Sequence, residues 1–201
     1  MRRGVACGVA GILGATATWP VNAHLVETGF GGFYDGVAHV ALTAADLLVV
    51  LALALLAGQR GTQAARWSLF ALPAAWFVAG MAGAMQGNPA TTLPVLTTLS
   101  FGVAGALAAL GARLPPAAVA AYAAVAGGAH GYVNGATLAP GGAGVLALAG
   151  AAAAVFCVLA LTSAQVAVLR PGWTRIAVRV AGSWLGAAAL LMLGWQARLS
   201  G

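Results

Sequence analysis

The apolar stretch VAHVALTAADLLVVLALALLA, which spans residues 37–57, sets the class of fold that this sequence predicts. Its length suits an α-helix crossing the roughly 30 Å hydrocarbon core of a bilayer, which takes about 20 residues. Further apolar runs of similar length follow, separated by short links with turn residues: 66–85, 94–112, 116–135, 144–169 and 177–196. We therefore predict an all-α fold, a polytopic transmembrane helical bundle of six spans.

The composition of the whole chain agrees with this fold class. Of 201 residues, 62% are hydrophobic and only 6% are charged, against about 25% charged residues in soluble domains. The nine basic and three acidic residues give a net charge of +6, but they are too scattered to form a nucleic-acid-binding surface. We expect the lipid bilayer to surround the protein, and we expect no nucleic acid as a partner.

The N-terminal segment has the features of a secretory signal peptide. Arg2 and Arg3 precede a small-residue apolar stretch over 4–18, and Val21-Asn22-Ala23 suits cleavage after Ala23. We expect residues 1–23 to be a cleavable signal peptide and 24–201 to form a single transmembrane domain. If the signal is retained, the bundle has seven helices.

The arginines predict how the bundle is oriented. They follow the first, third and fifth runs, whereas the links after the second and fourth runs carry no charge: Arg60, Arg66, Arg113, Arg170, Arg175 and Arg179. The positive-inside rule places such links in the cytoplasm. This predicts a bacterial inner-membrane protein whose mature N-terminus is periplasmic, as a cleaved signal requires. Arg198, near the outer end of the last run, is the exception.

The acids and histidines beyond residue 23 gather on the predicted periplasmic side. These are His24, Glu27, Asp35, His39, Asp46 and His130. An ionisable side chain inside a bilayer is costly and usually faces the bundle interior, a partner or water. On a continuous helix His39 and Asp46, seven residues apart, would share one face at about 10 Å.

Imidazole and carboxylate groups are ligands of Ni²⁺, Co²⁺, Zn²⁺ and Cu²⁺. A mature N-terminus at His24 would add an amine, and Glu27 would add an oxygen. We expect all six residues to handle a transported divalent metal, with no tightly bound cofactor. Ordinary structural roles remain open: His130 could bond between helices, Asp46 could pair with a histidine, and Asp35 could cap a helix.

The methionines leave copper open as the metal. Met81, Met85 and Met192 lie near the predicted level of the histidines, and thioethers favour Cu(I). Methionine is, however, more often an adaptable filler of apolar gaps.

Four segments together resemble the HupE/UreJ family: GFYDGVAH at 32–39, DLL at 46–48, LLAGQRG at 55–61 and AHGYVNG at 129–135. Members of that family are small bacterial membrane proteins found with hydrogenase or urease genes and regarded as nickel or cobalt permeases. The resemblance therefore implies uptake of a divalent metal across the inner membrane.

The resemblance carries over to individual residues. His39 matches the leading histidine of the family's first motif, and His130 matches the His-Gly of its second. The first family motif closes with an acid and a histidine, where this chain has Ala45 and Asp46. The second often ends in glutamate, where this chain has Thr137. Asp46 would thus replace an imidazole with a carboxylate.

These observations favour a nickel or cobalt permease with an outward-facing His/Asp/Glu site. Two alternatives stay open: a non-transporting integral membrane subunit of a larger complex, and a copper-handling membrane protein. A membrane-complex partner or a homo-oligomer fits any of them. We do not expect an enzyme, because the serines at 68, 100 and 163 are dispersed on apolar runs, where a serine usually bonds its own backbone.

Overall fold

The computed structural model describes residues 28–86, 93–138, 144–169 and 172–199, and these residues contain helices and no strand. The helices are α1 Gly32–Leu42, α2 Ala44–Gln59, α3 Thr62–Gln86, α4 Leu93–Leu110, α5 Pro116–Leu138, α6 Gly144–Val168 and α7 Trp173–Leu199. The predicted all-α fold is confirmed. The predicted signal peptide, His24 and Glu27 lie outside the described residues.

The first predicted span is broken, which corrects the expectation of one continuous helix. Helices α1 and α2 meet at an angle of 75° around Thr43, whose backbone is extended at φ −84° and ψ 105°. The Thr43 N–H donates to the carbonyl of His39 and closes α1, while the Thr43 carbonyl accepts from Asp46 and Leu47 and starts α2. The Thr-x-x-Asp spacing at 43–46 is typical of a helix N-terminus.

The membrane-spanning character of the bundle rests on helix length and composition. Helices α3, α6 and α7 are long and apolar enough to cross a bilayer, and the bent α1–α2 pair makes a fourth candidate. Helix α4 contributes a shorter apolar segment, Pro94–Leu110. The described residues thus give three or four candidate spans, and the count of six stays a prediction.

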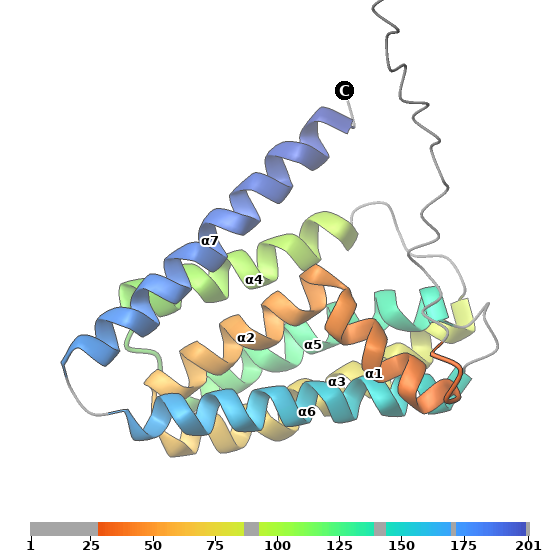
Figure 1. Ribbon diagram of the computed structural model, residues 1–201, viewed down its shortest axis with the longest axis horizontal. Coiled ribbons are helices and arrows are strands. Elements are labelled where there is room, and N and C mark those ends of the chain that lie inside the picture. The colour runs from red at the N-terminus through yellow and green to blue at the C-terminus, as the bar shows by residue number, and fades with distance from the viewer. Residues whose placement is uncertain (1–27, 87–92, 139–143, 170–171, 200–201) are drawn as a thin grey trace, which may run out of the picture.

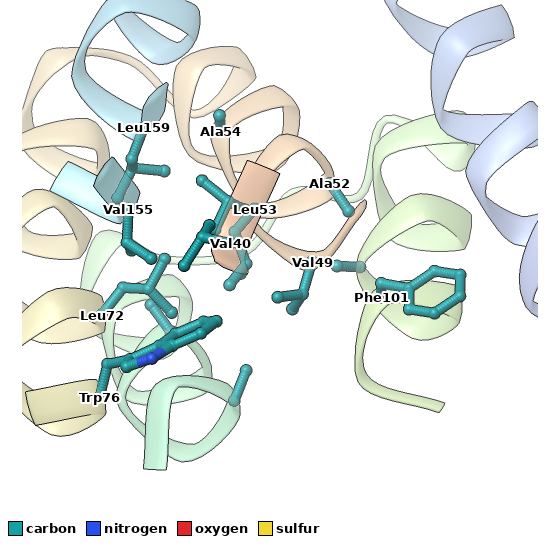
Figure 2. Close-up of a cluster of buried hydrophobic side chains, with 14 of the residues drawn as sticks. Val40, Val49, Ala52, Leu53, Ala54, Leu72, Trp76, Phe101, Val155 and Leu159 are labelled. Atoms are coloured by element: carbon teal, nitrogen blue, oxygen red, sulfur yellow. The ribbon is translucent and has the colours of Figure 1, made fainter. Parts of the chain in front are cut away.

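Helix α2 lies at the centre of the bundle, where it contacts every other helix of the described chain (Figure 1). Helix α6 lies along both α1 and α2, α3 pairs with α5, and α4 pairs with α7. All seven helices contribute side chains to one buried apolar cluster. Figure 2 shows part of it, with Val40, Leu53, Leu72, Trp76 and Val155 drawn together.

Glycines bring α3 and α5 into direct backbone contact. A Cβ added at Gly131 would collide with the carbonyl of Trp76, and one added at Gly135 would collide with the carbonyl of Gly80. Small residues let helices approach this closely where no hydrophobic effect draws them together within lipid. The contact fixes the height and rotation of α5, and therefore the position of His130 on it.

Candidate metal-handling site at the helix break

The carboxylate of Asp46 lies between two imidazoles. Its Oδ1 accepts a hydrogen bond from His130 Nδ1 at 2.7 Å, and its Oδ2 lies 3.8 Å from His39 Nε2. All three side chains are buried, with 3% of Asp46, 5% of His39 and none of His130 exposed. A buried carboxylate needs such partners, because an unpaired charge in an apolar interior is very costly.

The broken span puts two helix ends at this carboxylate. Asp46 lies in the first turn of α2, where the helix dipole stabilises negative charge. His39 lies in the last turn of α1, so the bend brings its side chain to the start of α2. The break therefore places both residues at helix ends that face each other.

His130 is held through both ring nitrogens and one ring face. Its Nε2 lies 2.9 Å from Ser100 Oγ, and its ring stacks on Trp76 with centroids 5.4 Å apart. The Ser100 hydroxyl also lies 2.7 Å from the carbonyl of Thr97. A neutral ring can accept at Nε2 from Ser100, and a protonated ring can donate there while Ser100 donates to Thr97. The contacts thus accommodate either charge state.

Asn134 completes the set of groups around Asp46. Its Nδ2 donates to Asp46 Oδ2 at 2.9 Å and to the carbonyl of His130 at 2.9 Å. Its Oδ1 is buried without a hydrogen-bond partner among the described residues. Sequence reasoning did not assign Asn134 a role. Its spacing could have indicated one, because Asn134 lies four residues after His130 and therefore on the same face of the helix.

The structure brings together three of the six predicted residues, His39, Asp46 and His130. The predicted separation of about 10 Å between His39 and Asp46 was wrong, because the bend at Thr43 folds α1 back toward the start of α2. Asp35 instead accepts hydrogen bonds from the backbone N–H and the hydroxyl of Thr28, each at 2.7 Å. His24 and Glu27 lie outside the described residues.

Within the described part of the chain, no group of three or more His, Cys, Asp or Glu side chains is arranged to hold a metal ion. The nearest approach to one is the 3.8 Å separation of His39 Nε2 and Asp46 Oδ2. Two donors that each lie about 2.1 Å from one ion are roughly 3–4 Å apart. The His39–Asp46 pair has a spacing that one ion could share, while His130 and Asn134 donate hydrogen bonds to the same carboxylate.

The methionines do not share one environment. Met85 is 86% exposed, Met192 packs against the main apolar cluster, and Met81 packs against a separate small cluster that includes Leu138 and Leu148. These contacts are those of packing side chains, and they give no particular support to a thioether site for Cu(I).

Replacing Asn134 with alanine should lower the free energy of unfolding by about 1–2 kcal/mol, because Asp46 loses one of its two hydrogen-bond donors. Thermal unfolding of the purified protein in detergent, followed by circular dichroism, measures the change. Thr137→Ala is the matched control: among the described residues, the hydroxyl that it removes bonds only the carbonyl of Asn134 on the same helix. Equal destabilisation by the two substitutions would contradict a specific role for Asn134.

We compared the sequence and the fold with those of known proteins and found one match. The family model described as HupE / UreJ protein matches residues 12–192, which is most of the chain and includes every residue of the Asp46 cluster. Comparisons with curated proteins and with solved structures each gave no match.

Proposed function

Because this chain belongs to the HupE/UreJ family, whose members are membrane proteins associated with nickel and cobalt transport, we propose that it is a permease that moves divalent nickel or cobalt across the bacterial inner membrane. The observation that carries the proposal is the buried Asp46 carboxylate between His39 and His130. Nitrogen and oxygen donors of this kind bind both ions.

The proposed path begins outside the membrane. In the predicted orientation, the N-terminal segment and α1 face the periplasm, and His24, Glu27 and Asp35 would gather the hydrated ion there. The ion would then pass to His39 and Asp46 at the helix break. Interrupted helices whose ends point at the transported species are a recurring feature of ion sites in transporters.

The hydrogen bonds around Asp46 bear on how tightly it could hold an ion. His130 and Asn134 both donate to the carboxylate, and these bonds stabilise its negative charge. An arriving ion must compete with these donors, which keeps binding reversible enough for release. The sequence has no phosphate-binding loop and no lysine, so the ion gradient or membrane potential, about 2.3 kcal/mol per charge per 100 mV, would supply the energy.

The test is uptake of radiolabelled nickel and cobalt by cells that produce the protein, compared with cells that do not. His39→Ala and His130→Ala should each reduce uptake to near the background of cells without the protein. Ser68→Ala is the matched control, because it removes a fully buried hydroxyl that has no hydrogen-bond partner in the described chain. Uptake by both histidine variants at the unsubstituted level would overturn the assignment of the site.

The same cells test the main alternative. A non-transporting subunit would give no uptake above background and would co-purify with a stoichiometric partner. Isolated permease, by contrast, should bind nickel or cobalt without such a partner.

Uptake should fall as the external medium becomes acidic. A metal binds the lone pair of neutral imidazole, and protonation of a ligating His39 removes it. Initial uptake rates over a series of external pH values, at a fixed membrane potential, measure this effect. A rate that is unchanged, or that rises in acid, would contradict ligation by His39.

A further inference from the structure

A cavity of about 600 Å³ lies at the end of the bundle where the links α2–α3, α4–α5 and α6–α7 meet. The charged side chains around it are all arginines: Arg60, Arg113, Arg175 and Arg179. The proposed metal path does not use this cavity, since Asp46 lies at the other end of α2. What this cavity could bind must therefore be argued from its own lining residues.

No described carboxylate compensates these arginines. Asp46 precedes Gln59, at the cavity, by 13 residues of one helix, which is about 20 Å. Asp35 lies on α1, beyond the helix break, and bonds Thr28. Asp46 pairs instead with His39 and His130. The cavity therefore carries a local excess of positive charge among the described residues.

Two of the guanidinium groups are already held in place by the α4–α5 region. Arg179 Nε donates to the carbonyl of Ala109 at 2.7 Å, and Arg60 Nη1 donates to that of Ala112 at 3.2 Å. Arg60 Nε is buried and has no hydrogen-bond partner among the described residues. The remaining N–H groups of such a planar fork match the oxygens of a phosphate.

Apolar side chains accompany the arginines. Leu110, Val166, Leu169 and Val178 also line the cavity, and Leu110 is 73% exposed. Basic pockets between membrane helices, with apolar surface beside them, suit lipids whose headgroup is an anionic phosphate. Helices α3, α5 and α7 all begin in the links at this end, so their positive dipole ends add to the attraction.

We propose that this cavity binds a phosphate group, and that the phosphate belongs to the headgroup of an anionic lipid in the leaflet at the arginine-rich end of the bundle. The arginines bind the phosphate oxygens, and the neighbouring leucine and valine side chains contact the start of the acyl chains. The proposal does not depend on metal transport.

The test uses the full-length protein, purified in detergent, with phosphatidylglycerol and phosphatidylcholine as probes in native mass spectrometry. Phosphatidylglycerol should remain bound where phosphatidylcholine does not. The double substitution Arg113→Gln/Arg175→Gln should weaken phosphatidylglycerol binding about tenfold or more, since each basic residue near the headgroup contributes about 1 kcal/mol. Both side chains are exposed, so their loss should leave the fold intact, which circular dichroism checks.

The matched control is Arg66→Gln/Arg198→Gln, which removes the same charge from exposed side chains that do not line the cavity. It should change phosphatidylglycerol binding less than twofold. Equal weakening by both double variants, or equal binding of the two lipids without any arginine-dependent binding of inorganic phosphate, would overturn the proposal.

A separate arm titrates inorganic phosphate against the bound lipid. Millimolar phosphate should not displace phosphatidylglycerol if the acyl chains contribute. Arginine-dependent binding of inorganic phosphate, with no preference for phosphatidylglycerol over phosphatidylcholine, would support the phosphate chemistry and overturn the lipid as its source.

Discussion

Asp46→Asn should reduce nickel and cobalt uptake by at least about 100-fold. The amide keeps the volume of the carboxylate but loses its charge and one of its oxygen donors. Loss of a group that merely orients a ligand already costs about 10–100-fold in metal affinity, and Asp46 is the only described carboxylate near both histidines. Radiolabelled uptake, normalised to the amount of protein in the membrane, measures the effect.

This substitution separates transport from folding. An amide oxygen at position 46 can still accept from Asn134, and the amide N–H can donate to His130 if the ring moves its proton to Nε2, where Ser100 Oγ lies 2.9 Å away. We therefore expect a destabilisation of only about 1 kcal/mol. Asp46→Ala, which removes the acceptor of His130 Nδ1 and one of the two acceptors of Asn134 Nδ2, should cost more, because each buried donor left unsatisfied costs about 1–3 kcal/mol. Normal uptake by Asp46→Asn would show that the cluster is structural.

Gly131→Ala and Gly135→Ala should each lower the free energy of unfolding by about 3 kcal/mol and strongly reduce the amount of folded protein. The new methyl group would meet backbone atoms of α3, which cannot move aside as a flexible side chain can. In the Gly131 variant the displaced backbone belongs to Trp76, which stacks on His130. The metal-handling cluster should therefore be disturbed together with the helix contact.

Gly128→Ala is the matched control, on the same helix and three residues away. A Cβ at Gly128 meets nothing within 4 Å, so the substitution should be neutral or should stabilise α5 by up to about 1 kcal/mol through helix propensity. Thermal unfolding in detergent and accumulation in membranes give the comparison. Similar losses in all three variants would contradict the close contact between α3 and α5.

The sequence predicted most of the helices well, because the apolar composition and length of each run are visible in the run itself. The ends of the runs at 144–169 and 116–135 lie within three residues of those of α6 and α5, since a chain of apolar residues in lipid must satisfy its backbone internally and the turn residues end each helix. The break at Thr43 was missed. The run from 37 to 57 is apolar apart from Thr43 and two ionisable residues. An average of hydropathy over the run does not reveal that one residue has an extended backbone.

The candidate site was predicted only in part. Sequence reasoning selected His39, Asp46 and His130 because ionisable groups in apolar runs are rare. It gave Asn134 no role, and it expected Ser100 to bond its own backbone, as serines on apolar runs usually do. Ser100 does approach the carbonyl of Thr97, but it also lies against His130. Whether an uncharged polar side chain meets a partner on another helix depends on how its own helix is rotated. The local sequence does not predict that rotation.

By itself, then, the chain's composition and the period of its apolar runs determined an all-helical membrane fold, and its few ionisable residues marked where chemistry could occur. Only the tertiary structure decided that His39 approaches Asp46 across a bend. It also decided that His130 reaches Asp46 from a helix 84 positions away in sequence. The physical reason is that hydropathy is a property of each segment alone. Whether His39, Asp46 and His130 come together depends on how the helices are rotated and how closely their backbones approach. At the α3–α5 interface, glycines set that approach.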